Sequence, residues 1–63
     1  MEKGAHPVFK IVGRDQGYWI GADIGGDTHF VDYVIWVDIG DYVVVDFMHD
    51  KSVWKPLARV DGY

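Results

Sequence analysis

Residues 30–50 read FVDYVIWVDIGDYVVVDFMHD, and this stretch decides the fold class. Apolar residues recur at every second position on both sides of the Asp-Ile-Gly-Asp sequence at 38–41. A period of two is typical of β-strands, and a Gly beside Asp is typical of a tight turn. The stretch therefore predicts a long β-hairpin whose turn lies at 38–41.

The register of this hairpin decides which side chains share a face. An odd-numbered loop has Asp38 and Ile39 in a type I turn and Gly40 in the left-handed conformation. A two-residue Gly40-Asp41 turn is the alternative, and it would send one apolar set to the opposite face. We prefer the odd loop because it gathers one apolar set for the core. That core face consists of Val31, Tyr33, Ile35, Val37, Val43, Val45 and Phe47.

The rest of the chain contains further short strand patterns separated by Gly and Asp. We expect strands at 7–12 and 18–24, a break at 25–28, a tight Pro-containing turn at 54–57 and a short edge strand at 58–60. The pattern predicts an all-β chain, a small five-stranded SH3-like barrel built around the long central hairpin. An OB-type barrel normally needs more residues. We expect one domain over 1–63, with flexible ends at 1–6 and 61–63.

Length and composition narrow the means of stabilisation. A chain of 63 residues without Cys buries a small core and has no disulfide or thiolate metal site. No stretch has the apolar length of a secretory signal or a transmembrane helix, so we expect a cytoplasmic protein without membrane contact.

Charge is distributed unevenly along the chain. Eight Asp and no Lys or Arg lie between Arg14 and Lys51, and the formal net charge is −4. A nucleic-acid interface needs Lys and Arg to neutralise phosphates, so the middle of the chain is unsuited to one. Short Asp side chains also suit turns and a soluble surface, which is the simpler explanation for many of them.

The second face of the predicted hairpin is apolar and acidic, and it is our candidate partner-binding surface. The odd loop places Asp32 opposite Asp46, and like charges across strands repel each other. A cation, a shared proton or a basic side chain from a partner would relieve that repulsion. The candidate residues are Phe30, Asp32, Val34, Trp36, Asp38, Tyr42, Val44, Asp46 and Met48.

Two other kinds of chemistry are weaker hypotheses. The predicted register brings His29 and His49 together near Asp27 and Asp50, a set that could bind a divalent ion, but no ligand-spacing motif supports it. Two wet loop-end histidines are the simpler explanation. A shared proton on an Asp pair could serve acid–base catalysis, but no third catalytic group is evident. We therefore predict no enzyme activity, no metal and no cofactor.

These observations favour a non-enzymatic protein-interaction module that binds through the hairpin face. The partner would be a protein with a basic surface, and an inhibitor of a nucleic-acid-binding protein would fit this description. Self-association through the same face, as a homo-oligomeric structural protein, is one alternative. The other is a small barrel that binds nucleic acid through the terminal Lys and Arg residues, which we rank below a protein partner.

Overall fold

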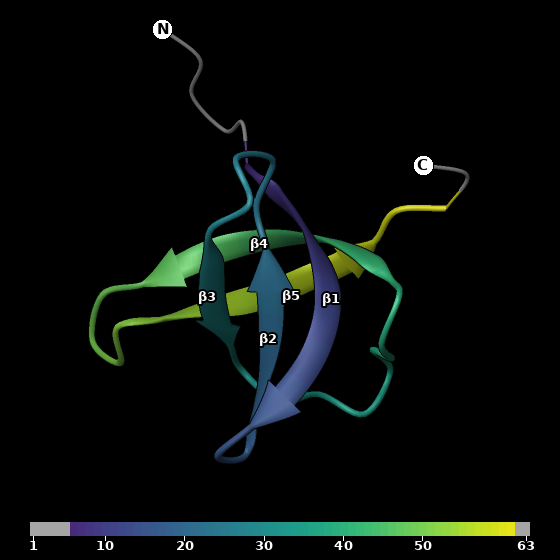
Figure 1. The fold of residues 1–63 in the computed structure, drawn as a ribbon. Helices are drawn as coiled ribbons and strands as arrows, with labels where there is room; N and C mark the ends of the chain where they lie inside the picture. The colour runs from purple at the N-terminus through teal and green to yellow at the C-terminus, as the bar shows by residue number, and fades with distance from the viewer. Residues whose placement is uncertain (1–5, 62–63) are drawn as a thin grey trace, which may run out of the picture.

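The computed structural model describes residues 6–61, and these residues form five strands joined by turns and irregular connections. Figure 1 shows the strands curled around a common axis. The first two strands form a hairpin, and a long connection separates the third strand from the fourth. The bounds are β1 Val8–Asp15, β2 Tyr18–Ala22, β3 Thr28–Val31, β4 Tyr42–Met48 and β5 Val53–Arg59.

The strands close into a barrel in the order β1-β2-β3-β5-β4. β4 pairs antiparallel with β1, so β4, β1, β2 and β3 lie side by side in the Greek-key order. β5 then fills the gap between β4 and β3. The prediction of an all-β, five-stranded barrel of small SH3-like size is confirmed. A five-stranded Greek-key barrel is also the architecture of OB-type domains.

The core follows from the alternation of apolar residues along β1 and β4. Phe9 and Ile11 of β1 and Val43 and Val45 of β4 point inward and are almost fully buried, because successive side chains of a strand face opposite sides. Trp19, Val31, Val37 and Val53 are buried as well. The aromatic ring of Trp54 packs edge-on against Phe9 and is partly buried against this core.

Gly21 permits a close approach between β2 and the core. A Cβ atom at this position would lie 2.9 Å from the Cβ of Phe9 and 3.1 Å from a Val31 methyl group. These Phe9 and Val31 atoms belong to the packed core and have little freedom to move away. A side chain at position 21 would clash with them, so this position requires Gly.

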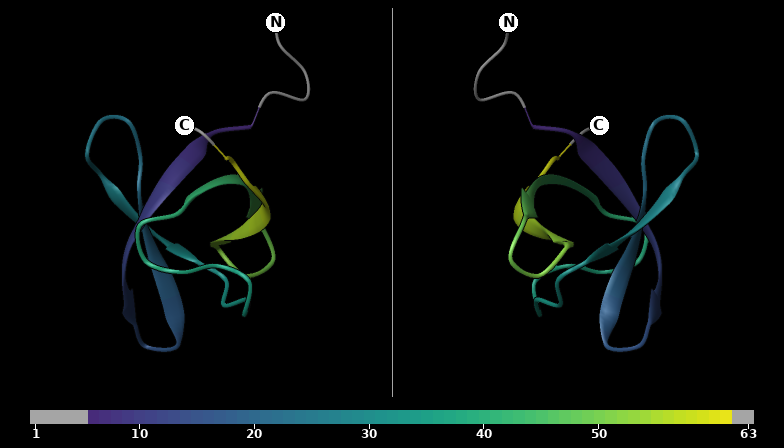
Figure 2. Two further views of the ribbon diagram at one scale, coloured as in Figure 1. Left: turned by 90° about the vertical axis from the view of Figure 1, so that its right-hand side faces the viewer. Right: turned by 90° about the vertical axis from the view of Figure 1, so that its left-hand side faces the viewer.

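The predicted central hairpin is wrong. β3 ends at Val31 and pairs with β2 and β5, whereas β4 pairs with β1 and β5. The ten residues 32–41 form a connection without strand structure. Figure 2 shows this connection, in teal, leaving the end of β3 and reaching β1 before it enters β4.

The turn chemistry at the end of this connection was predicted in part. Gly40 has φ of 99°, the left-handed conformation expected for it. The Asp41 N–H donates to the Asp38 carbonyl at 3.1 Å, which makes Ile39 and Gly40 the central pair of the turn. A positive φ at the second central position is typical of a type II turn and not of type I. This turn leads from the connection into β4 and does not join two paired strands.

The prediction for the last segment is also corrected. β5 is one strand from Val53 to Arg59, where a turn at 54–57 and a short edge strand at 58–60 were expected. Pro56 lies inside it and is buried, next to a shift of the β4–β5 register. β5 pairs with β3 only at Trp54, so β3 has no residue paired with Pro56. The missing N–H of Pro56 therefore costs no hydrogen bond to β3. Most of the predicted flexible ends, 1–5 and 62–63, lie outside the described residues.

Candidate interaction surface

The connection at 32–41 is tied to the barrel by backbone and side-chain hydrogen bonds. The Asp32 N–H donates to the Trp54 carbonyl at 2.7 Å, and the indole Nε1–H of Trp19 donates to the Val34 carbonyl at 3.0 Å. At its far end the Gly40 N–H donates to the Ile11 carbonyl at 2.7 Å. A connection held at three places presents its outer side chains in a defined arrangement.

Two valines of the connection face inward. Val37 is 4% exposed and belongs to the core. Val34 is partly buried and packs against the same core. Their spacing of three residues, across a turn at Ile35 and Trp36, lets both side chains cover the end of the barrel. The predicted outward orientation of Val34 is therefore wrong, and so is the placement of Tyr33 and Ile35 on the core face.

Four large side chains of the connection face outward instead. The exposed fraction is 87% for Ile35, 58% for Ile39, 44% for Tyr33 and 42% for Trp36. Single exposed apolar residues are ordinary, but four within seven positions form a patch. We call this patch, together with Asp32 and Asp38, the connection face.

The outer part of this patch is braced from the barrel by Arg14. Its guanidinium carbon lies 4.4 Å from the centroid of the Tyr33 ring and 5.1 Å from that of Trp19. The Tyr33 and Trp19 rings are themselves stacked, with centroids 5.6 Å apart. Cation–π contacts of this kind hold Tyr33 against the barrel and leave its outer side accessible.

The acids of the connection have two different roles. Asp38 accepts a hydrogen bond from the Ile39 N–H, and Asp41 accepts one from the Asp38 N–H and lies 3.7 Å from Arg59. These two carboxylates order the turn. This is the structural role that the sequence analysis gave as the simpler explanation for many of the Asp residues. The half-buried Asp32 makes no side-chain hydrogen bond or ion pair within residues 6–61. Its carboxylate remains available to a cationic partner.

The other residues of the predicted face lie on the outside of β3 and β4. Tyr42, Val44, Asp46 and Met48 alternate outward along β4 as expected. Their neighbours differ from the prediction because β4 pairs with other strands. Tyr42 lies opposite Lys10 of β1, and Asp46 lies opposite Lys55 of β5 and 3.7 Å from His6. The predicted Asp32–Asp46 pair is not formed. The catalytic hypothesis depended on this pair and therefore loses its basis.

A separate aromatic surface lies on the outside of β2 and β3. Phe30 is 39% exposed, lies opposite Ile20 and contacts Tyr18 with ring centroids 5.5 Å apart. Neither strand contributes a Lys or Arg to this surface. The sequence placed Phe30 on the same face as residues of 42–48, so it did not anticipate this grouping with β2.

His29 and His49 do not meet. His49 contacts the Phe47 ring, while His29 Nε2 lies 2.8 Å from an Asp23 carboxylate oxygen and its ring stacks on Phe9. Within residues 6–61 no group of three or more His and acidic side chains could hold a metal ion. The predicted juxtaposition of the two histidines is therefore wrong.

Asp23 orders the β2–β3 turn. One of its carboxylate oxygens accepts hydrogen bonds from the Gly25 and Asp27 N–H groups at 2.9 and 3.0 Å, and the other contacts His29. The hydrogen bond with His29 lowers the pKa of Asp23 below its ordinary value of 3.8, and the backbone donors act in the same direction against some desolvation. The ordered turn displays Ile24, whose side chain is fully exposed.

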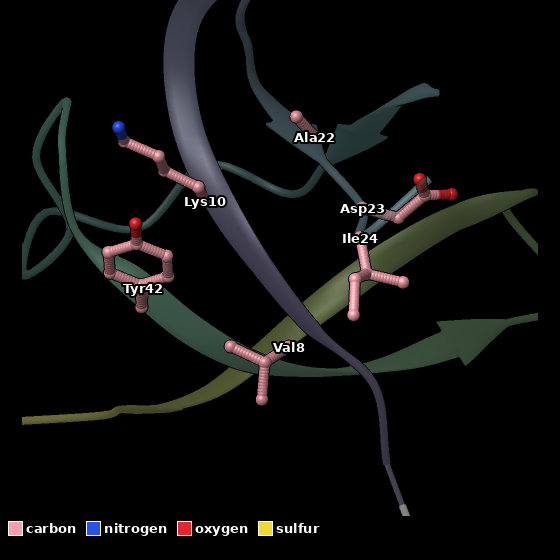
Figure 3. Close-up of a pocket in the computed structure, with 6 residues that line it drawn as sticks. All are labelled: Val8, Lys10, Ala22, Asp23, Ile24 and Tyr42. Atoms are coloured by element: carbon pink, nitrogen blue, oxygen red, sulfur yellow. The ribbon is translucent and has the colours of Figure 1, made fainter. Parts of the chain in front are cut away.

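Beside this turn the barrel surface is hollowed into a groove of about 240 Å³. Figure 3 shows its side chains around β1, with Lys10 and Tyr42 on one side and Ala22, Asp23 and Ile24 on the other. Val8 completes the lining. The sequence did not reveal this groove, because β4 is far from β1 and β2 in the chain and only the observed topology places the three strands side by side.

Comparison with known proteins finds no match. No family model fits the chain, and neither a curated protein nor a solved structure shows significant similarity to it. Among residues 6–61 there is also no helix long and apolar enough to cross a membrane. The function must therefore be argued from the surfaces described above.

Proposed function

We propose that this protein is a non-enzymatic protein-interaction module and that the connection face is its docking surface. The observation that carries the proposal is the outward presentation of Tyr33, Ile35, Trp36 and Ile39 on a segment fastened to the barrel. Fastening matters because a rigid segment loses less conformational entropy on binding than a free loop.

The charge around the connection face indicates the kind of partner. Asp32 and Asp38 flank the apolar side chains, and Arg14 is stacked against two rings. A partner that combines Lys or Arg with an apolar pocket complements this surface. The groove of a nucleic-acid-binding protein has that character, so an inhibitor of such a protein is the specific form of this proposal. Its affinity would come from Trp36 and Ile35, with electrostatics speeding association.

A selection with random peptides tests the proposal. The wild-type chain is used as bait against a displayed peptide library, and the affinities of the selected peptides are measured by fluorescence anisotropy. We expect basic peptides with an aromatic or aliphatic residue. Binding should fall by about tenfold or more in the Ile35→Ser, Trp36→Ser double variant and weaken as salt is raised.

Leu57→Ser is the matched control, because Leu57 is 42% exposed, like Trp36, and lies on β5 and not on the connection. This variant should bind the selected peptides like the wild type. Asp32→Lys separates charge from apolar contact, since the Asp32 carboxylate has no structural partner in residues 6–61. If the double variant selects and binds the same peptides as the wild type, the connection face is not the docking surface.

A second candidate function is single-stranded nucleic-acid binding on the outside of β2 and β3. It is favoured by the exposed Phe30 beside Tyr18 and Ile20, since OB-type Greek-key barrels bind oligonucleotides on this face and stack bases on aromatic rings. The sequence-based hypothesis assigned nucleic-acid binding to the terminal Lys and Arg residues. Lys55 instead lies opposite Asp46, and Arg59 approaches Asp41.

Anisotropy of a labelled oligothymidine at low salt tests this second candidate. Binding that is lost in Phe30→Ala and retained in Trp36→Ser would support it. Absence of binding at low salt would eliminate it, because electrostatic contributions to nucleic-acid affinity are greatest there.

A further inference from the structure

The groove between the β2–β3 turn and β4 has the features of a docking site for side chains. Its lining is mainly apolar, from Val8, Ala22 and Ile24, with the ring of Tyr42 at one side. Ile24 is fully exposed at the rim, so a group entering the groove would gain an apolar contact that the barrel itself does not supply.

The groove is smaller and more open than the usual binding site of a small-molecule ligand. Sites for such ligands usually enclose about 300–1,000 Å³ and surround the ligand on most sides. This groove encloses about 240 Å³ and is open to solvent. It suits one or two side chains presented by a protein surface.

The charge of the groove comes from Lys10. Its ammonium lies 5.8 Å from the centroid of the Tyr42 ring and forms no salt bridge with an acid in residues 6–61. Asp23, the acid of the lining, is engaged by His29 and two backbone N–H groups. A carboxylate on the incoming surface could therefore form a salt bridge with Lys10, because Asp23 is already engaged by other groups.

We propose that this groove takes the connection face of a second copy of the chain. The connection face supplies the matching chemistry, with Ile35 and Trp36 for the apolar lining and Asp32 or Asp38 for Lys10. This inference rests on the connection face that the proposed function also uses, and it adds the groove as a second, internal partner for that face.

The geometry of this contact determines the kind of assembly. The connection face and the groove are different surfaces, so a single contact between two copies leaves one connection face and one groove open to further copies. Such head-to-tail contacts continue into rings or filaments and do not stop at a two-fold dimer. Self-association would also compete with the foreign partner for the connection face.

Sedimentation velocity across a wide range of protein concentrations tests the proposal. The average mass of the wild type should rise past that of a dimer as concentration increases. Lys10→Glu and Trp36→Ser should each weaken association by about tenfold or more. Lys51→Glu makes the same charge change on an exposed turn outside the groove and should associate like the wild type.

Mixing the two variants gives the sharper result. The Lys10→Glu copy retains an intact connection face, and the Trp36→Ser copy retains an intact groove. Together they should form one-to-one dimers that do not grow further, which a misfolded variant could not do. Circular dichroism melts of each variant confirm that both remain folded.

Three results would overturn the inference: a wild type that remains monomeric at every concentration, a Lys10→Glu variant that associates like the wild type, or a mixture that forms no dimer. None of these three results tests binding to a foreign partner. The Lys10→Glu variant has an intact connection face and should bind the selected peptides like the wild type. Failure of the proposed function would appear separately, as unchanged peptide binding by the Ile35→Ser, Trp36→Ser variant.

Discussion

The segments 32–38 and 42–48 both have apolar residues at every second position, yet only the second is a strand. β4 lies between β1 and β5, so its backbone has a neighbouring strand on each side. The connection crosses the end of the barrel and is held by a few individual hydrogen bonds. Alternation thus predicts a strand only where the topology provides neighbouring strands for it.

Valine truncation in β4 should have the largest effect on the free energy of unfolding. Val45 is fully buried between β1 and β5, and Val45→Ala removes two methyl groups from a site with little room to collapse. We expect a loss of about 2–3 kcal/mol, which is a large share of the stability of so small a domain. Urea unfolding followed by tryptophan fluorescence measures it, and a loss below that of Val37→Ala would reverse the comparison.

Val37→Ala tests the same truncation in the connection. Val37 is also buried, but its segment has no flanking strands. The segment can therefore relax into the space that the truncation leaves. We expect a smaller loss of about 1–2 kcal/mol, because the cost of a cavity depends on how far the site collapses. The same urea experiment applies. An equal loss at Val37 and Val45 would mean that the connection is as rigid as a central strand.

Arg14→Gln should loosen the connection with a smaller effect. It removes the cation above Tyr33 and Trp19, and exposed cation–π contacts contribute about 0.5–1 kcal/mol. Lys51→Gln is the control, because Lys51 is exposed on the β4–β5 turn. Hydrogen exchange should become faster at residues 33–37 and remain unchanged in β4. Faster exchange throughout the barrel would assign Arg14 to global stability instead.

The β2–β3 turn offers a third kind of segment, ordered by a carboxylate. The pKa of Asp23 is lowered in the folded protein, so its contribution is present above the unfolded value and is lost as pH falls through the folded value, below 3.8. Asp23→Asn should therefore flatten the fall of the melting temperature in that acidic range. Asp27→Asn, in the same turn, is the control. Parallel acid profiles for Asp23→Asn and the wild type would contradict this role.

Ile35→Ser should have the smallest effect on stability. Its side chain is 87% exposed, and surface substitutions away from structural contacts usually change stability by less than about 0.5 kcal/mol. A destabilisation comparable to that of Val37→Ala would show that Ile35 contributes to the folded barrel and is not held ready for a partner.

The sequence was sufficient for the fold class and for much of the local structure. The all-β class, the outward set of β4 and the left-handed Gly40 all follow from short-range patterns. Strand pairing did not follow from them. Residues 30–37 alternate as a strand does, and nothing local indicates that β3 stops at Val31 or that β4 returns to lie beside β1.

The candidate site was predictable only where it depends on a single segment. Asp32, Trp36 and Asp38 remain on the exposed connection, while Val34 turned inward to cover the barrel end. The groove could not be predicted, because Tyr42 joins Lys10 and Ile24 only through the pairing of β4 with β1, which the sequence did not reveal. Its Lys and its exposed Ile each resemble an ordinary surface residue when considered alone.

The single pairing between β3 and β5 has a consequence for the order in which the barrel forms. Val31 and Trp54 are the one ladder pair between these parallel strands within residues 6–61, and the Asp32 N–H donates to the Trp54 carbonyl. Non-local parallel pairings form slowly because the intervening chain must first be ordered. We therefore expect a curled sheet to assemble first and to close along this seam last. The same seam should open first in native fluctuations, with the Asp32 amide proton as its reporter.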